Sequence, residues 1–564
     1  MKLFGSIIKY FLISLLVLAA AGYGYYHFFI YEPPLITDED RAQITLLPLP
    51  AKLELLGVAV PLSEGITPSF TDKNTNLTKQ AIERFSRHTN LPITQNGMAL
   101  TISLESEDET QTLQTDESYT LQVRPSGIYI ESNHSIGVIR ALETVRQLIT
   151  DSASLPVVEI TDHPRFPWRG LMVDVSRHFI PREVILRIIE SMAAVKMNVF
   201  HWHLSDDQGF RVESKVFPSL HEIGSNGLYY SQDEVREVIE FARQRGIRVI
   251  PEFDVPGHSQ SWQLAYPQLS SLDEVPGFGQ GGTFSAPMDP TREEVYEFLD
   301  QLVAEMGELF PDEYFHIGGD EVNPAAWEEN QRIQDFMRSK GFGDHHELQG
   351  YFNERMQKIL IKHGKRMLGW DEILTPSLDT GVIVQSWTSH RALFEAVQQG
   401  GTAILSAGLY LDHILPAGKH YTVDPLVLEG AINIEPDTSQ WKMFDQVMEV
   451  GDNKMESQVV IFDRDPQDVS GFFAMMSDRL PFEGGSIEDG ILTCVMDGPA
   501  GEMTYTANIE GDSLEGSISL GLLSFSAKGY RSGGSQMPGT SMPEIQVMRP
   551  LTDSEKDRII GGEA

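Results

Sequence analysis

Cysteine is almost absent from this chain. The 564 residues include one cysteine, Cys494. A single thiol excludes an intrachain disulfide and any zinc site built from several cysteines. A lone thiol without a neighbouring partner fits a small core residue better than a nucleophile.

Basic residues are scarce. Lysine and arginine total 43 against 81 aspartates and glutamates, a formal net charge of -38 at pH 7. Such a balance argues against nucleic acid or an anionic membrane surface as a partner. It fits a soluble, highly charged surface. We found no internal repeat at the periods of solenoids or propellers.

Charged side chains are missing from one N-terminal stretch. Tyr10 to Tyr31 runs 22 residues without one, counting His27 as neutral, and lysines precede it. A run of this length crosses a bilayer as a helix, and the lysines favour a cytoplasmic N-terminus. We therefore predict a membrane anchor over 1–31, with the catalytic domain on the exported side, periplasmic or extracellular. The alternative is a signal peptide cleaved near "AAAG" (19–22), which gives a secreted protein.

The remaining chain divides by pattern. A Pro-containing linker spans 32–44, and a small α+β domain follows over 45–162, where "YTLQVRPSGIYIES" reads as a hairpin and 137–149 as a helix. Short β segments separated by Gly, Asp and Ser turns indicate a mostly β insertion over 429–548.

Between these parts, residues 163–428 alternate strands with helices. Seven apolar runs are followed in most cases by helical patterns, for example 232–245, 292–309, 347–363 and 390–399. This alternation is typical of a parallel sheet, and the number of units predicts a (β/α)8 TIM barrel. The insertion then falls between strands 7 and 8, and residues 549–564 begin strand 8.

Polar or aromatic residues end each of the seven runs: "DVSRH", "HLSDD", "EFDVPGH", "GGDE", "GWDE", "QSW" and "YLD". The carboxyl ends of barrel strands carry the active site. The adjacent acids Asp320 and Glu321 follow two glycines there. On an extended chain they would point to opposite sides and serve two atoms of one substrate. The structural alternative is the first turn of the next helix, where acids are favoured.

Aromatic side chains accompany these strand ends. Their faces suit sugar rings, and packing alone is the alternative reading for any one of them. They are Trp202, Trp262, Trp370, Trp387 and Tyr410. The pair His201 and His203 could be metal ligands, but no third ligand stands out. We expect them to support Asp206 and Asp207 by hydrogen bonds, with no metal and no cofactor.

The motifs "RGLMVDVSRH", "HWHLSDDQGF", "PEFDVPGH", "HIGGDE", "GWDE" and "LYLD" stand in one order along 163 to about 425. In this the chain resembles glycoside hydrolase family 20, the β-N-acetylhexosaminidases, and 45–160 resembles the small domain that precedes the barrel in that family. The resemblance implies exo-acting, retaining hydrolysis of terminal N-acetylglucosamine or N-acetylgalactosamine, with the 2-acetamido oxygen as nucleophile.

The resemblance also implies residue roles. Glu321 would be the general acid and then the base, while Asp320 would hold the acetamido N–H. Tyr410 would aim the acetamido oxygen, and Trp370 and Trp387 would wall its pocket.

Further roles concern the rest of the sugar and the support of the acid. Arg177 and Asp412 would bind sugar hydroxyls, which closes the far side of the sugar and makes cleavage exo. The supporting residues would be Asp206, Asp254, His258 and His316.

Two alternatives to the enzyme remain: a catalytically impaired glycan-binding protein on the same barrel, and a membrane-anchored adhesion or scaffold protein that acts through its insertion. Within the enzyme reading, chitooligosaccharides, peptidoglycan fragments and GalNAc-bearing glycans all carry the 2-acetamido group. The resemblance further implies that "RIIGGEA" would run on into a Trp-x-Glu motif. We therefore expect a fragment of a longer gene product, poorly soluble and nearly inactive as written. The alternative is a natural terminus, with another tryptophan such as Trp441 in place of the missing one.

Overall fold

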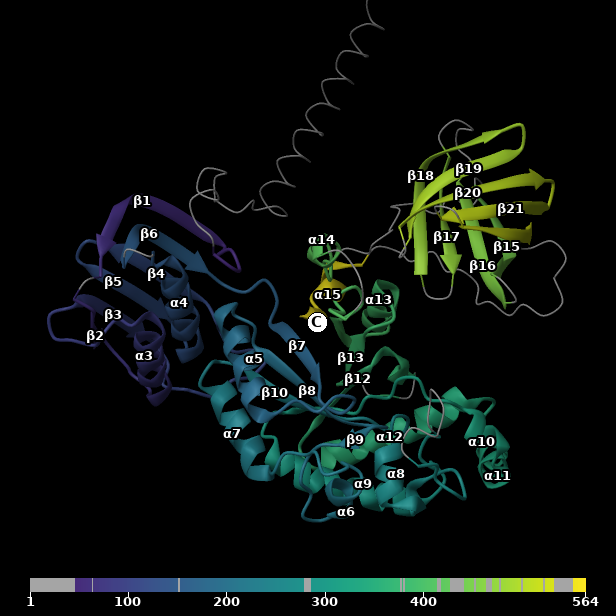
Figure 1. Cartoon of the computed structure of the whole chain (residues 1–564), viewed down its shortest axis with the longest axis horizontal. Helices are drawn as coiled ribbons and strands as arrows, with labels where there is room; N and C mark the ends of the chain where they lie inside the picture. Colours follow the sequence, from purple (N-terminus) through teal and green to yellow (C-terminus); the bar gives the residue numbers. More distant parts are fainter. Residues whose placement is uncertain are drawn as a thin grey trace, which may run out of the picture. The chain divides into compact units, whose positions relative to one another are not determined.

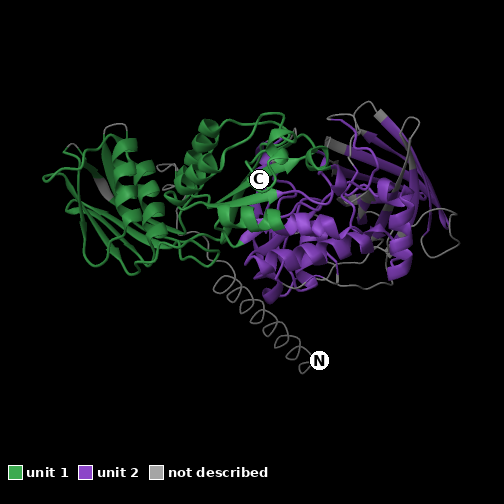
Figure 2. Cartoon of the chain, turned by 90° about the horizontal axis from the view of Figure 1, so that it is seen from below, with its two compact units in different colours: residues 1–252, 261–266, 301–313 green, residues 253–260, 267–300, 314–564 purple. Residues whose placement is uncertain are grey.

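The computed structural model describes residues 46–62, 64–150, 153–277, 286–375, 378, 381–412, 417–426, 441–450, 453–462, 469–475, 478–498, 501–520, 523–531 and 551–564. Its helices and strands are labelled in Figure 1. They belong to two compact units, green and purple in Figure 2: 1–252 with 261–266 and 301–313, and 253–260 with 267–300 and 314–564.

The predicted membrane segment, Tyr10 to Tyr31, lies outside the described residues, as does the predicted linker at 32–44. Among the residues that the structure does describe, no helix is long and apolar enough to cross a membrane.

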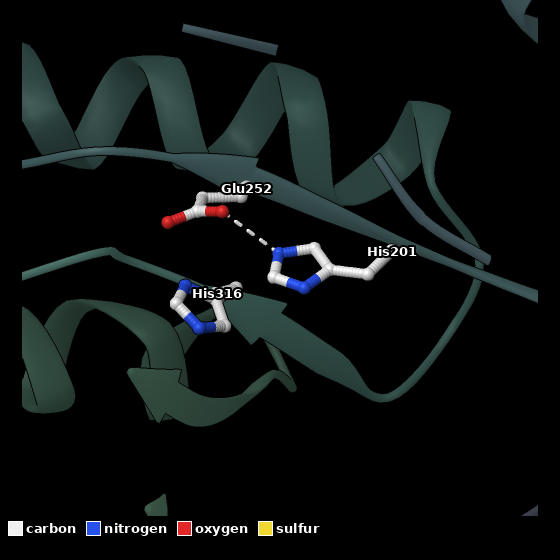
Figure 3. Close-up of side chains that lie close together, drawn as sticks. All are labelled: His201, Glu252 and His316. Carbon is white, nitrogen blue, oxygen red and sulfur yellow. Dashed lines mark ion pairs between the residues drawn. The ribbon is translucent and has the colours of Figure 1, made fainter. Parts of the chain in front are cut away.

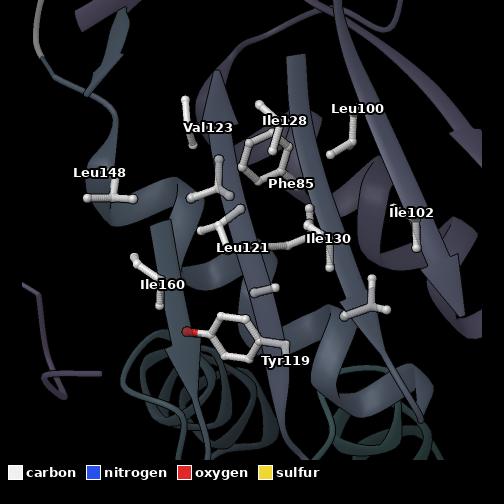
Figure 4. Close-up of a cluster of buried hydrophobic side chains, with 14 of the residues drawn as sticks. Phe85, Leu100, Ile102, Tyr119, Leu121, Val123, Ile128, Ile130, Leu148 and Ile160 are labelled. Atoms are coloured by element: carbon white, nitrogen blue, oxygen red, sulfur yellow. The ribbon is translucent and has the colours of Figure 1, made fainter. Parts of the chain in front are cut away.

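The N-terminal part is a six-stranded sheet with the order β1-β6-β4-β5-β3-β2. The strands alternate buried and partly exposed residues, so one face of the sheet packs against helices and closes a core around Phe85, Leu121 and Ile130 (Figure 4). Arg124 pairs with Gly127, which confirms the predicted hairpin. The elements are β1 (Lys52–Pro61), β2 (Ile66–Phe70), α3 (Asn76–Thr89), β3 (Met98–Leu104), β4 (Tyr119–Arg124), β5 (Gly127–Ser132), α4 (Ser135–Leu148) and β6 (Ser154–Asp162).

A second sheet carries the barrel, in the strand order β10-β11-β12-β13-β14-β23-β7-β8-β9 with a further β10–β8 pairing that closes it. Without the short β9 (Gly209–Phe210), eight strands form the ring. They are β7 (Trp168–Asp174), β8 (Val199–Asp206), β10 (Arg248–Phe253), β11 (Tyr314–His316), β12 (Arg366–Trp370), β13 (Ile383–Ser386), β14 (Thr402–Leu405) and β23 (Ile559–Glu563).

Helices follow the strands at the predicted places, and four predicted helices match α7, α9, α12 and α13 to within two residues. Their apolar faces pack on the strands, as Leu393 and Val397 do beside β13 and β14. The main helices are α5 (Arg182–Ala194), α7 (Gln232–Arg243), α9 (Glu293–Leu309), α11 (Gln331–Lys340), α12 (His345–Lys362) and α13 (His390–Gln398). Shorter ones are α6 (Ser219–Glu222), α8 (Gln260–Ala265), η2 (Pro267–Leu269), α10 (Ala325–Glu329), η3 (Asp371–Ile373), α14 (Ala417–Tyr421) and α15 (Asp553–Lys556).

Between β14 and β23 the chain builds a second closed barrel of eight strands, β15 to β22, in sequence order. Neighbouring strands pair antiparallel, including β15 with β22. Alternate side chains point inward, and Phe444, Phe473 and Tyr505 are among those that fill the core. The strands are β15 (Trp441–Val450), β16 (Asn453–Phe462), β17 (Val469–Met475), β18 (Asp478–Glu488), β19 (Ile491–Gly498), β20 (Gly501–Glu510), β21 (Ser513–Leu520) and β22 (Leu523–Arg531).

Candidate active site

The loop after β11 carries the two adjacent acids, and it is not an extended strand. The strand ends at His316, and Gly318, Gly319 and Glu321 have φ values of 68°, 90° and 49°. Our expectation that Asp320 and Glu321 alternate sides of an extended chain is therefore wrong. The loop instead takes a left-handed backbone at Gly318, Gly319 and Glu321, which glycine adopts freely and glutamate does not.

Close contacts explain why the two glycines cannot be replaced. A Cβ on Gly318 would overlap the Asp254 carboxyl, and a Cβ on Gly319 would overlap Ile373. The backbone therefore passes closer to these two side chains than any other residue type would allow.

Neighbouring side chains hold the loop through its backbone. The Gly318 N–H donates to His316 Nδ1 at 2.9 Å, and the Gly319 N–H donates to Asp254 Oδ1 at 3.1 Å. Gln349 Nε2 donates to the Gly319 carbonyl at 2.7 Å. His316, Asp254 and Gln349 are buried, so these contacts fix the loop away from water.

His258 lies beside both acids. Its Nε2 is 3.6 Å from Asp320 Oδ2 and 3.4 Å from Glu321 Oε2. The Asp320 side chain is 14 % exposed and that of Glu321 is 35 % exposed, so the two carboxyls differ in their access to solvent. His258 also has a positive φ of 45°. Backbone strain of this kind concentrates at functional sites.

A third carboxyl approaches from the end of β12. Glu372 Oε2 accepts the N–H of Glu321 at 2.6 Å. Partial burial, and then the charge of Asp320, raise the pKa of Glu372 to about 7. Its neighbour Asp371 accepts from the Thr388 hydroxyl at 2.5 Å and from the Thr388 N–H at 3.2 Å. The motif "GWDE" thus connects β12 to the loops on both sides.

Aromatic rings lie near the same loops. The rings of Trp370 and His316 are 5.0 Å apart between centroids at an angle of 64°. Trp387 and Tyr410 are 6.4 Å apart at 45°. Trp370 is buried, whereas Trp387 and Tyr410 are half-buried. Asp412 is exposed in the turn beyond Tyr410.

In the other unit, carboxylates surround Arg177. Its Nη2 is 2.6 Å from Asp206 Oδ2, and its Nη1 is 3.0 Å from Asp174 Oδ2. The Arg177 side chain is 40 % exposed while that of Asp206 is buried. Carboxylate pairing on one side and solvent on the other leaves a preoriented cation at the end of β7.

The two histidines of "HWH" pair with an acid that the sequence analysis did not name. His201 Nε2 is 2.8 Å from Glu252 Oε2 (Figure 3), and His203 Nδ1 is 2.9 Å from the same oxygen. His203 Nε2 lies 3.3 Å from Asp206, so its predicted support of Asp206 is confirmed, whereas the support predicted for His201 stays a prediction.

The electrostatics of this group favour a charged imidazole. Burial acts to lower the pKa of His203, but the carboxylates of Glu252 and Asp174 outweigh it and hold the pKa well above its ordinary value. The signal for Glu252 was present in the sequence, because it is the one acid inside the buried strand "RVIPEF".

Two of the tryptophans that we placed near a cleft belong to the core. Trp202 packs against Tyr230, with ring centroids 4.8 Å apart, and Trp262 packs against Phe210 at 5.2 Å. Both indoles are buried, at 0 % and 1 % exposure. Trp202 and Trp262 therefore pack in the core and do not line a sugar-binding cleft.

A metal-binding geometry exists beside the acids. Asp254, His258 and Asp320 offer ligand atoms that lie within 4.8 Å of one another. Carboxylate and imidazole groups are ligands that Zn²⁺ accepts. The same three side chains already contact the acid-bearing loop or one another, so a role in hydrogen bonding requires no ion.

Comparison with known proteins identifies relatives. The family model "Glycosyl hydrolase family 20, catalytic domain" matches residues 166–460, and "Glycosyl hydrolase family 20, domain 2" matches 43–163. Beta-hexosaminidase subunit A2 of Dictyostelium discoideum is 35% identical over 400 residues, 68% of this chain and 73% of that protein. Beta-hexosaminidase subunit beta of Homo sapiens is 39% identical over 354 residues, 59% of this chain and 62% of that protein.

Solved structures give the same result. A Flavobacterium johnsoniae chitobiase has a TM-score of 0.65 and 36% identity, covering 69% of this chain and 62% of that one. An exo beta-N-acetylglucosaminidase from Vibrio harveyi, in complex with N-acetylglucosamine, has a TM-score of 0.60 and 30% identity, covering 69% and 67%. The match spans about two thirds of the length of these relatives.

Proposed function

Because the chain belongs to glycosyl hydrolase family 20, we propose that it is an exo-acting β-N-acetylhexosaminidase that uses the 2-acetamido group of its substrate as the nucleophile. The observation that carries this proposal is the left-handed loop after β11. It presents both acids beside His258, with Asp320 less exposed than Glu321.

In this proposal the two acids act on different atoms. Glu321, the more exposed of the two, protonates the leaving oxygen and then deprotonates the attacking water. Asp320, with its lower exposure, holds the acetamido N–H and stabilises the positive charge that develops as the acetamido oxygen attacks C1. No carboxylate of the enzyme bonds to the sugar in this scheme, in line with the substrate-assisted exception among retaining glycosidases.

Aromatic and polar side chains then serve the acetamido group. Trp370 and Trp387 wall its pocket, and the Tyr410 hydroxyl donates to the acetamido oxygen and aims it at C1. The half-buried position of Trp387 and Tyr410 supports this reading, because a wall of the pocket must face substrate.

In this proposal Arg177 and Asp412 bind the hydroxyls of the sugar. The exposed side of the Arg177 guanidinium suits a bidentate grip on vicinal hydroxyls, and the carboxylates of Asp174 and Asp206 hold it in place. Asp254, His258 and His316 support the acid-bearing loop. Binding of all hydroxyls of one terminal sugar would make cleavage exo.

The test compares three 4-nitrophenyl β-glycosides, those of GlcNAc, GalNAc and plain glucose, with the full-length gene product. We expect turnover of a 2-acetamido glycoside and at most trace turnover of the glucoside. Binding of GlcNAc without hydrolysis would mean a glycan-binding protein instead. Efficient glucoside hydrolysis would exclude substrate assistance.

For location, we propose an anchored protein with its catalytic domain on the exported side. The uncharged run Tyr10 to Tyr31 supports this. Fractionation of cells should place the activity in the membrane pellet, accessible to protease only from the exported side. A soluble product starting near Gly22 would mean a cleaved signal peptide.

A further inference from the structure

The backbone of Glu321 is held in an unfavourable conformation by a carboxylate with no role in the proposed chemistry. Glu321 has φ 49°, in the left-handed region that a glutamate disfavours. Its N–H donates to Glu372 Oε2 at 2.6 Å, a short hydrogen bond. Such conformations persist where the surroundings fix them.

Several further hydrogen bonds hold the part of the loop that precedes the acids. Gly318 is held by His316 and by the N–H of Trp370, which donates to its carbonyl at 2.9 Å. Gly319 is held by Asp254 and Gln349. These bonds fix the loop up to Gly319. The bond from Glu372 is made to the residue that carries the acid, two positions further on.

We propose that Glu372 is a positioning residue: its carboxylate holds the Glu321 backbone in the left-handed conformation and so aims the Glu321 carboxyl at the leaving oxygen. The inference rests on the proposed function. A turn of this backbone toward an ordinary conformation would move the Glu321 carboxyl away from His258, now 3.4 Å distant, and from the substrate.

The identity of residue 372 follows from this role. Its position on η3, directly after Trp370 and Asp371, brings an acceptor to the Glu321 N–H. An amide oxygen keeps an acceptor at the same reach, an aspartate is one methylene shorter, and an alanine has none. Burial, and then the charge of Asp320, raise the pKa of Glu372, which agrees with a carboxyl that lies against the acid pair.

The experiment uses Glu372→Ala, Glu372→Asp and Glu372→Gln in the full-length gene product, with aryl GlcNAc glycosides of good and poor leaving groups. A misplaced acid matters most when the leaving oxygen needs a proton. We expect Glu372→Ala to lower kcat for the glycoside with the poorest leaving group by roughly 10- to 100-fold. The kcat for the 4-nitrophenyl glycoside should fall far less. Glu372→Asp should fall between, and Glu372→Gln should keep most of the activity.

The matched control is Glu329→Gln, which removes an exposed acid on α10, the helix that follows the loop, and should change neither kcat nor the leaving-group dependence. Equal losses on good and poor leaving groups, or parent-like kinetics of both Glu372→Ala and Glu372→Asp, would overturn the inference. If Glu372→Ala does not fold, Glu372→Asp decides by the same criterion. A parent that hydrolyses no 2-acetamido glycoside would refute the proposed function, which is a separate result.

Discussion

Two closed barrels of eight strands stand in this chain, and they use their strands in opposite ways. In the barrel β7 to β23 neighbouring strands such as β7 and β8, or β11 and β12, pair parallel. Buried His and acid residues lie on or just beyond its strands, among them Glu252, Asp254 and His316. In the barrel β15 to β22 the neighbours pair antiparallel and the interior is mostly apolar. Its described buried polar side chains include Gln446 and Ser457, which carry no charge.

The difference shows what topology allows. Parallel strands bring all their carboxyl ends to one rim, so a polar residue after each strand adds to a single site. Antiparallel strands send successive ends to opposite rims, which disperses such residues. The parallel barrel shows this arrangement, because the paired acids, Trp370 and Trp387 all lie at or just after the carboxyl ends of its strands. We therefore attribute the chemistry to the parallel barrel and expect changes in the second barrel to leave the reaction unaffected.

The largest effect should come from the acid of the parallel barrel. Glu321→Gln keeps the shape of the side chain but removes the proton that the leaving oxygen needs. We expect a loss of about 10² to 10⁴ in kcat on a poor leaving group and a smaller loss on 4-nitrophenyl glycosides. Steady-state kinetics on both substrates checks this, and equal losses would count against the role of Glu321.

The next effect tests the close approach of the loop backbone. Gly318→Ala adds a Cβ that overlaps the Asp254 carboxyl at φ 68°, so the loop must move. We expect roughly 10- to 100-fold lower kcat/KM, since small displacements of a catalytic group have effects of this size. Gly364→Ala is the matched control, because Gly364 has φ 72° with no atom within 4 Å of the added Cβ. Equal activity of the two variants would show that the overlap has no consequence.

A smaller effect should separate binding from proton transfer. Asp371 accepts hydrogen bonds from Thr388 on one side of Trp387 and, at 3.2 Å, from the Ser386 hydroxyl on the other. Asp371→Asn should loosen this turn and the wall that Trp387 offers to the acetamido group. We expect KM to rise by about threefold to tenfold, roughly 1 kcal/mol, at every leaving group. A loss confined to poor leaving groups would instead connect Asp371 to the acid.

The smallest effect concerns the antiparallel barrel. Burial raises the pKa of the Cys494 thiol to about 12. At pH 8 the thiol of the folded chain therefore stays protonated, and a protonated thiol is a poor nucleophile. Iodoacetamide should label the native protein far more slowly than the protein in urea, with kcat/KM unchanged by the treatment. Rapid labelling at pH 8 without denaturant would show that this barrel opens.

Sequence patterns predicted most of the fold, and the reasons are local. The helix after β13 followed from apolar periodicity, and the strand at Ile559–Glu563 followed from the family resemblance. The residues that contact the site could not be predicted from these patterns. Glu372 reaches Glu321 only because the loop turns left-handed, and Glu252 meets His201 and His203 only once β8 and β10 pair. Contacts between distant segments depend on backbone paths that periodicity does not encode.

The most direct test of the central claim measures kcat/KM for 4-nitrophenyl GlcNAc glycosides whose acetyl group carries zero, one, two or three fluorine atoms. Fluorine withdraws electrons from the acetamido oxygen, and little else in the substrate changes. If that oxygen is the nucleophile beside Asp320, kcat/KM should fall steeply and steadily with each fluorine. An unchanged kcat/KM across the series would mean that another group attacks C1 and would contradict the account.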